Sequence, residues 1–209
     1  MRQRYLTAFF PVLLLALTGC VASSSTPPNY YLLTAIAEPV DISRPIRVGV
    51  GPVTIAPFLD RSQMAMRSGG GNLALRDAHR WGEPLDDGIE RVLVQNLAAI
   101  TGGQLVGFPW RRVSAPKYAV RLDVLDMNVT ASEEAVLELI WQLEDLEQNR
   151  LLADRHEHLF QPLPTGIAPY EAMAMAYSEL LGQLAGRING ELLKVLDGDA
   201  TTPANKAND

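Results

Sequence analysis

Residues 84–103 read PLDDGIERVLVQNLAAITGG and carry the strongest helix signal of the chain. Pro84 suits the first helical position, and Asp86 and Asp87 follow it, close to the positive end of the helix dipole. Gly102 and Gly103 favour termination of the helix. Apolar residues recur at helical spacing at Leu85, Ile89, Val92, Leu93, Leu97 and Ile100. The stretch therefore predicts an amphipathic helix, and the segments on either side of it decide what it packs against.

The sequence after this helix predicts three strands and a second helix. Apolar and polar residues alternate over 118–124, and the apolar phase then shifts at Val124–Leu125, which predicts a β-bulge. Alternation returns over 137–143, and residues 151–160 form the next strand candidate. A closing helix is predicted over 169–196, because apolar residues recur there at helical spacing.

The sequence before the first helix predicts further strands. Residues 30–33 are a short strand candidate, and residues 46–55 alternate but contain glycines and a proline that indicate a bend or a sheet edge. Residues 63–67 and 72–81 flank the glycine-rich stretch 68–71, which predicts a β-hairpin. The order of strands, helix, strands and helix predicts an α+β fold, with a single antiparallel-rich β-sheet covered by two amphipathic helices.

The composition excludes several classes of protein. The 209 residues are 47% hydrophobic, which is typical of a globular protein and argues against overall disorder. The net charge of -6 argues against nucleic-acid binding, which needs a basic surface. One cysteine excludes an internal disulfide and a multi-cysteine metal site. We therefore expect no nucleic-acid partner and no cofactor.

The first twenty residues resemble the leader of a bacterial lipoprotein. Arg2 and Arg4 precede an apolar stretch over 5–17, which is too short to span a membrane. Leu17-Thr18-Gly19-Cys20 resembles a lipobox, which implies cleavage before Cys20, acylation of its sulfur, for example by palmitate, and acylation of its new amino group. Two or more acyl chains hold a protein stably on a membrane. The alternative is an ordinary signal peptide with a coincidental cysteine.

These features predict four regions. Residues 1–19 form the signal peptide, and residues 20–29 form a lipidated flexible tether. The folded domain follows over 30–196, and the polar residues 197–209 form a disordered tail. Because Val21 follows the cysteine in place of the aspartate that retains lipoproteins at the inner membrane of enteric bacteria, we expect an outer-membrane lipoprotein that faces the periplasm.

No common catalytic or phosphate-binding motif occurs in the sequence. Asp86, Asp87 and Glu90 can be a carboxylate cluster for acid–base chemistry, but their place at a helix start is typical of interaction with the dipole. His156 and His158 point to the same face of a strand and can bind a metal ion. Without a nearby third ligand, a surface pair of histidines is the simpler interpretation, so no metal site is predicted.

Partner binding is the alternative for a second group of residues. Asp60 and Arg61 follow an apolar strand, where they form a structural ion pair, cap a turn or recognise a partner. Trp81 and Trp110 lie beside arginines, a combination typical of interfaces, whereas Trp141 belongs to an apolar strand face. The methionines of the hairpin, at positions 64 and 66, offer another adaptable contact surface. Burial in the core is the alternative for each of these side chains.

Two sequence blocks resemble a known family. Residues 47–61 read RVGVGPVTIAPFLDR, and residues 80–85 read RWGEPL at the start of the first helix. With Tyr30-Tyr31-Leu32-Leu33 and the lipobox, they are similar to the ABC-type transport auxiliary lipoprotein family, whose blocks read V-x-P-V-x-I-P-x-Y-L-D-R and W-A-E-P-L. Phe58, Ala56 and Gly82 depart mildly from those blocks. The residues that match the motif and are candidates for partner binding are Asp60, Arg61, Trp81 and Glu83.

The resemblance implies a non-enzymatic accessory role in transport of lipids between membranes. Such lipoproteins act at the outer membrane with an MCE-domain protein, which bridges the periplasm and works with a membrane permease. The resemblance is compatible with a homo-oligomer and supplies no catalytic residue. An assembly factor for outer-membrane proteins or lipopolysaccharide, and an anchored hydrolase, are the alternatives.

Overall fold

The computed structural model describes residues 27–41, 45–68 and 72–201 of the 209-residue chain. The lipobox and the expected lipidation site, Cys20, lie outside the described residues. The elements are β1 (Asn29–Tyr31), β2 (Val48–Ile55), β3 (Gln63–Ser68), β4 (Asn72–Trp81), α2 (Leu85–Thr101), a 3-10 turn η1 (Arg112–Ser114), β5 (Tyr118–Val129), β6 (Glu134–Asp145), β7 (Arg150–Pro162) and α3 (Pro169–Thr201).

The predicted α+β class is confirmed, but the described strands form two sheets instead of one. One sheet has three strands in the order β1-β4-β3, and the other has four in the order β2-β5-β6-β7. Each sheet is mixed, because β1 pairs with β4 and β2 pairs with β5 in parallel, while the remaining pairs are antiparallel. The parallel pairs join strands that are distant in the sequence, so alternation alone did not indicate them.

Local signals placed most elements correctly. The register between β5 and β6 shifts between Val124 and Asp126, where the change of apolar phase predicts a bulge. The register of β2 against β5 shifts between Val50 and Val53, at the predicted bend. The residues that β6 turns inward are almost fully buried, namely Leu137, Leu139, Trp141 and Leu143.

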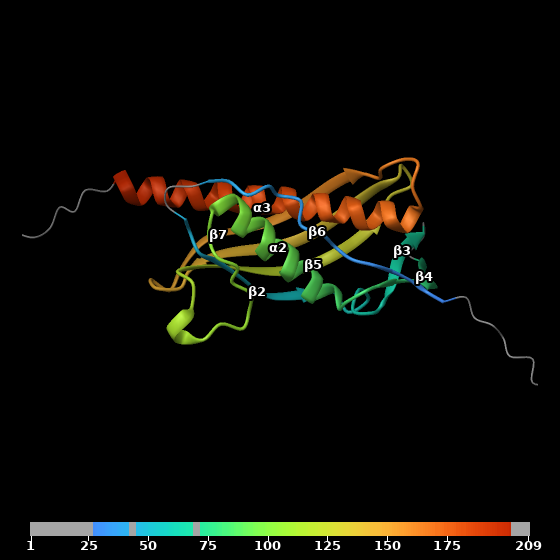
Figure 1. The fold of residues 1–209 in the computed structure, drawn as a ribbon, viewed down its shortest axis with the longest axis horizontal. Coiled ribbons are helices and arrows are strands. Elements are labelled where there is room, and N and C mark those ends of the chain that lie inside the picture. Colours follow the sequence, from blue (N-terminus) through green and yellow to red (C-terminus); the bar gives the residue numbers. More distant parts are fainter. Residues whose placement is uncertain (1–26, 42–44, 69–71, 202–209) are drawn as a thin grey trace, which may run out of the picture.

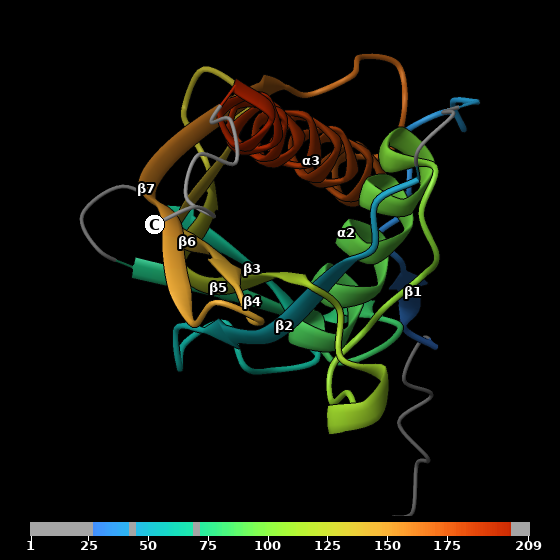
Figure 2. The ribbon, with the colours of Figure 1, turned by 90° about the vertical axis from the view of Figure 1, so that its left-hand side faces the viewer.

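Both helices pack on the same side of the four-stranded sheet. Figure 2 shows α2 and α3 side by side, with β7, β6, β5 and β2 curving around the opposite side. α2 contacts β2 and α3, and α3 contacts β6 and β7. The three-stranded sheet lies at one end of α3 (Figure 1). Apolar stripes of both helices are buried against the sheet, and Tyr177 and Trp141 are among the largest side chains of this core.

The start of α2 and the end of α3 differ in detail from the sequence prediction, whereas the end of α2 agrees with it. Pro84 occupies the N-cap position of α2 and precedes the first helical residue by one, and Gly102 ends the helix with a positive φ of 61°. α3 continues to Thr201, although the prediction ended it at about residue 196. Residues 197–201, which the sequence assigns to a disordered tail, are therefore helical, and the rest of that tail lies outside the described residues.

Residues 32–41, which follow β1, lie over the two helices. Ser178 on α3 accepts a hydrogen bond from the amide of Thr34 at 3.0 Å. Asn96 on α2 is fully buried, and its Oδ1 accepts hydrogen bonds from the amides of Ile36 and Ala37 at 3.0 and 2.9 Å. These bonds satisfy backbone donors that have no strand partner, so they tie the segment to both helices.

Candidate functional site: a hollow at the start of α2

The two sequence blocks meet at a hollow where β4 leads into α2. The hollow has a volume of about 330 Å³ and is lined by Asp60, Arg61, Ser62, Trp81, Gly82, Glu83, Pro84 and Leu85. We call it the Asp60–Leu85 hollow. The four candidates for partner binding that match the family motif, Asp60, Arg61, Trp81 and Glu83, all line it, although about twenty residues separate the blocks along the chain.

Backbone hydrogen bonds bring the blocks together. The amide of Trp81 donates to the carbonyl of Ser62 at 2.7 Å, and the amide of Gly82 donates to the carbonyl of Tyr31 at 2.8 Å. A turn before β3 is closed by the amide of Leu59, which donates to the carbonyl of Ala56. The hollow is thus built on the end of a sheet and the start of a helix, so its shape depends on regular secondary structure.

Burial decides the role of two side chains that the sequence offers for contact with a partner. Trp81 is only 7% exposed and contacts the ring of Tyr177, with ring centroids 6.4 Å apart. Met64 is fully buried in the core. The interface interpretation of Met64 is therefore wrong. Trp81 lines the hollow but exposes little of its own surface to a partner.

Asp60 and Arg61 are the polar groups that the hollow leaves available. Asp60 is exposed and Arg61 is half-buried. Among the residues that the structure describes, neither forms an ion pair, so the structural ion pair considered from the sequence does not form. The Nε atom of Arg61 is buried and has no hydrogen-bond partner within the described chain. Because Nε is buried, the donors that Arg61 can offer to an acceptor on another molecule are those of its terminal guanidinium nitrogens.

Glu83 has a structural role at the rim of the hollow. Its carboxylate forms an ion pair with Arg91 on α2 at 2.5 Å. Arg91 also donates to the carbonyl of Leu33 at 2.8 Å, which fixes the start of the segment between β1 and β2. Both oxygens of the Glu83 carboxylate accept hydrogen bonds from Arg91, so Glu83 orients the chain that enters α2.

A groove beside the hollow was not indicated by the sequence. It has a volume of about 390 Å³ and shares Glu83 with the Asp60–Leu85 hollow; the other lining residues are Asp87, Glu90, Arg91, Val94, Gln95, Leu105, Gly107 and Phe108. Phe108 is 46% exposed on its margin and packs edge to face against Trp110, with ring centroids 5.2 Å apart. Trp110 is itself half-buried. The loop that carries Phe108 reaches α2 only in the tertiary structure, so no local pattern indicated the groove.

Glu90 joins this loop to α2. Its Oε1 accepts a hydrogen bond from the amide of Phe108 at 2.8 Å. Burial raises the pKa of the Glu90 carboxyl above its ordinary value, the amide hydrogen bond opposes the rise, and the charges of Asp87 and Asp86 add to it. The cluster of carboxylates predicted at this helix start therefore includes one residue, Glu90, that holds a neighbouring loop in place.

The histidines lie away from the hollow. His79 on β4 bonds to the hydroxyl of Tyr31 at 2.9 Å and stacks on Tyr170, with ring centroids 3.8 Å apart. His156 and His158 share one face of β7, as the sequence predicts, and the structure adds a third neighbour, Glu138 of β6. The sequence analysis missed this neighbour because it comes from another strand.

No helix in the described ranges 27–41, 45–68 and 72–201 has an apolar stretch long enough to span a membrane.

Comparisons with known proteins agree with the fold and the blocks. The structure is similar to the crystal structure of a protein from Xanthomonas campestris, with a TM-score of 0.64 and 19% identity over 83% of this chain and 100% of that one. It is also similar to the crystal structure of an uncharacterized protein, with a TM-score of 0.65 and 18% identity over 80% of this chain and 99% of that one.

At these identities the two structures establish the fold alone. No curated protein sequence is significantly similar to the chain. The family model for the ABC-type transport auxiliary lipoprotein component matches residues 30–189, which include the hollow, all of α2 and α3 as far as residue 189. This match confirms the resemblance inferred from the blocks: the chain belongs to the ABC-type transport auxiliary lipoprotein family.

Proposed function

We propose that the chain is a non-catalytic subunit of a system that moves lipids between membranes. In this proposal the Cys20 lipid anchors it in the outer membrane, facing the periplasm, and the Asp60–Leu85 hollow docks an MCE-domain protein that spans the periplasm. The family match supports an accessory role in transport. The observation that carries the docking site is the convergence of Asp60, Arg61, Trp81 and Glu83 on one hollow.

The chemistry of the hollow suits recognition of a polar segment of another protein. An exposed carboxylate and an arginine with an unpaired buried donor lie beside a buried aromatic ring. Polar groups around a rigid aromatic support are typical of binding hot spots. The adjacent groove extends this surface with the exposed side chains of Leu105 and Phe108, which offer apolar contact area.

The proposal is tested by photo-crosslinking in the native membrane. A photoreactive amino acid at Ser62, on the hollow, is expected to crosslink to an MCE-domain protein. The same amino acid at Glu179, an exposed position on α3, serves as the control and is expected to give no such product. Crosslinks from Ser62 to an outer-membrane barrel protein, without any MCE-domain protein, would overturn the docking role and favour an assembly factor.

A charge variant tests the same surface without a bulky probe. The double substitution Asp60→Ala and Arg61→Ala removes the available polar groups of the hollow. We expect recovery of the MCE-domain protein from detergent-solubilised membranes to fall about tenfold, because loss of a hot spot costs at least about 1.4 kcal/mol. Unchanged recovery with a correctly folded variant would contradict this site.

A further inference from the structure

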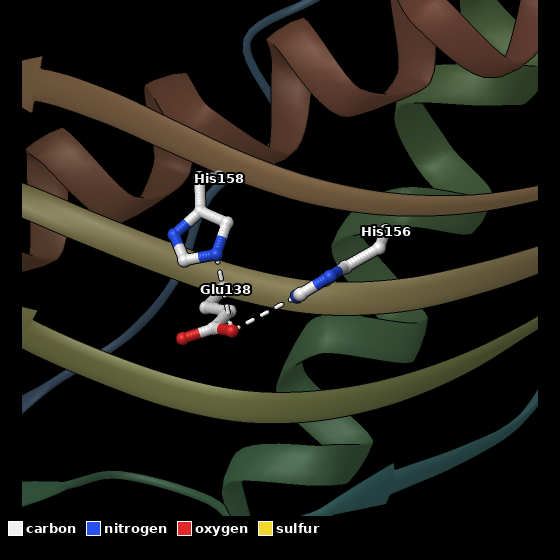
Figure 3. A group of neighbouring side chains, drawn as sticks. All are labelled: Glu138, His156 and His158. Atoms are coloured by element: carbon white, nitrogen blue, oxygen red, sulfur yellow. Dashed lines mark hydrogen bonds and ion pairs between the residues drawn. The ribbon is translucent and has the colours of Figure 1, made fainter.

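Three metal-ligating side chains meet on the outer face of the four-stranded sheet. Glu138 on β6 lies directly opposite His158 on β7, and His156 lies two residues earlier on β7, opposite Ile140. Figure 3 shows both imidazole rings flanking the Glu138 carboxylate. This cluster lies on the four-stranded sheet, whereas the hollow lies at the end of β4 in the three-stranded sheet. Neither the family match nor the proposed docking role uses the cluster.

The two imidazoles are directed at one oxygen of the Glu138 carboxylate. The Nε2 atoms of His156 and His158 lie 2.9 and 3.1 Å from the same oxygen, Oε1 of Glu138. The centroids of the two imidazole rings are 5.0 Å apart, and the possible ligand atoms all lie within 4.8 Å of one another. Ligands of a tetrahedral zinc ion are separated by about 3.4 Å, given metal–ligand distances of about 2.1 Å. Small rotations about the side-chain bonds therefore suffice to place all three around one ion.

The backbone that carries the cluster is held in a regular sheet. β6 pairs with β5 on one side and with β7 on the other, so Glu138 stands on an interior strand. Both histidines are about half exposed, and Glu138 is 27% exposed, so an ion can reach the site from solvent. The neighbouring Asp154 accepts a hydrogen bond from Gln142 at 2.9 Å, so its carboxylate already has a partner beside the cluster.

The donor set selects a class of metal. Two imidazoles and one carboxylate suit zinc, copper or nickel, whereas calcium and magnesium prefer sites made of oxygen ligands. Three protein ligands with an open position for water are the pattern of an open zinc site. On binding, each histidine gives the lone pair of its Nε2 atom to the ion. The proton that each Nε2 donates to Glu138 then moves to Nδ1 of the same ring or to solvent. We propose that Glu138, His156 and His158 form a surface site for Zn²⁺ or Cu²⁺.

The site is tested on the full chain purified in detergent without a histidine tag. Zn²⁺ is titrated in a calorimeter into the wild type and into His156→Gln, His158→Gln and Glu138→Gln. His79→Gln is the matched control, because His79 lies on the other sheet. We expect each histidine substitution to weaken Zn²⁺ binding at least about tenfold, with a smaller loss for Glu138→Gln and no loss for the control. Ca²⁺ is expected to give no binding at this site.

A spectroscopic measurement separates this site from unspecific binding. Cu²⁺ bound to the wild type is expected to show electron-paramagnetic coupling to two nitrogens, reduced to one nitrogen in either single-histidine variant. Circular dichroism checks that each variant is folded. Equal Zn²⁺ affinity in the wild type and the folded histidine variants, or the same copper spectrum in all of them, would overturn the proposal and leave the cluster as a surface hydrogen-bond network.

Discussion

At the residue scale, the two glycines that end α2 determine how the helix meets the chain before β2. Gly102 adopts a left-handed conformation that other residues reach only with strain. A Cβ atom on Gly103 would lie 2.0 Å from the carbonyl oxygen of Ile46. The amide of Ile46 in turn donates to the carbonyl of Thr101 at 3.1 Å. The backbones at Ile46 and Gly103 therefore cannot move apart without breaking this hydrogen bond.

Gly103→Ala is therefore expected to lower the free energy of unfolding by about 2 kcal/mol, since the added methyl group overpacks a backbone contact. Gly186→Ala is the matched control, because Gly186 is exposed on α3 and has nothing within 4 Å of the added atom. That control is expected to gain about 0.5–1 kcal/mol from helix propensity. Urea denaturation measures both; equal effects of the two substitutions would contradict the packing argument.

A pH dependence belongs to the same scale and follows from Glu90. The folded protein holds the Glu90 proton more tightly than the unfolded chain does, because burial raises the carboxyl pKa from its ordinary value of 4.5. The resulting contribution to stability is complete below pH 4.5 and is lost as the pH rises through the folded-state pKa.

Glu90→Gln keeps an acceptor for the amide of Phe108 and removes the titration. We expect the wild type to lose stability relative to this variant as the pH rises from 4 to 7. Chemical denaturation at several pH values measures the difference, with Glu179→Gln on an exposed part of α3 as the control. Parallel stability curves for the wild type and Glu90→Gln would show that Glu90 has no such linkage.

At the scale of elements, residues 32–41, which follow β1, are bonded to both α2 and α3 and act as a clamp across the two helices. Asn96 and Ser178 accept hydrogen bonds from its amides, and Arg91 donates a hydrogen bond to its carbonyl at Leu33. The carbonyl of Ala99 adds another bond by accepting from the amide of Val40 at 3.0 Å. The clamp explains why a buried polar residue, Asn96, interrupts the apolar interior of α2.

Asn96→Ala leaves the amides of Ile36 and Ala37 without their acceptor. We expect a loss of about 2–3 kcal/mol in the free energy of unfolding, because unsatisfied donors keep their full desolvation cost. Gln95→Ala, at the neighbouring half-buried position on α2, is the control and is expected to change stability by less than about 0.5 kcal/mol. Hydrogen exchange at residues 36 and 37 checks the mechanism; unchanged protection in Asn96→Ala would contradict it.

At the scale of the whole molecule, the proposed anchor sets the orientation of the domain. The described chain begins beside β1, at the same end of the molecule as β3 and β4 (Figure 1). Six residues lie between Cys20 and residue 27, and the seven residue steps that join the two positions reach at most about 25 Å. With Cys20 lipidated as proposed, we expect this end of the domain to lie nearer the membrane than the C-terminal end of α3 does.

Cys20→Ala is expected to leave the domain folded but to abolish its outer-membrane location. The reason is that the cysteine sulfur and amino group are the sites of acylation in the proposed anchor. Membrane fractionation with an antibody to the protein is expected to find an unprocessed or soluble product. Normal fractionation of the variant with the outer membrane would refute the anchor.

Local order was predictable from the sequence because it depends on neighbours along the chain. The start and end of α2, the hairpin of β3 and β4, and the bulge near Val124 each follow from residue types within a few positions. The buried face of β6 follows in the same way from strict alternation. The two blocks that revealed the family are also contiguous stretches.

The tertiary structure alone decided what depends on contacts between distant segments. It divided the strands into two sheets through parallel pairs, buried Trp81 against Tyr177, and gathered the blocks around one hollow. It also set the register that places Glu138 beside two histidines about twenty residues away. Periodicity fixes which face a side chain occupies, but only the pairing of strands and the packing of helices fixes which side chains become neighbours.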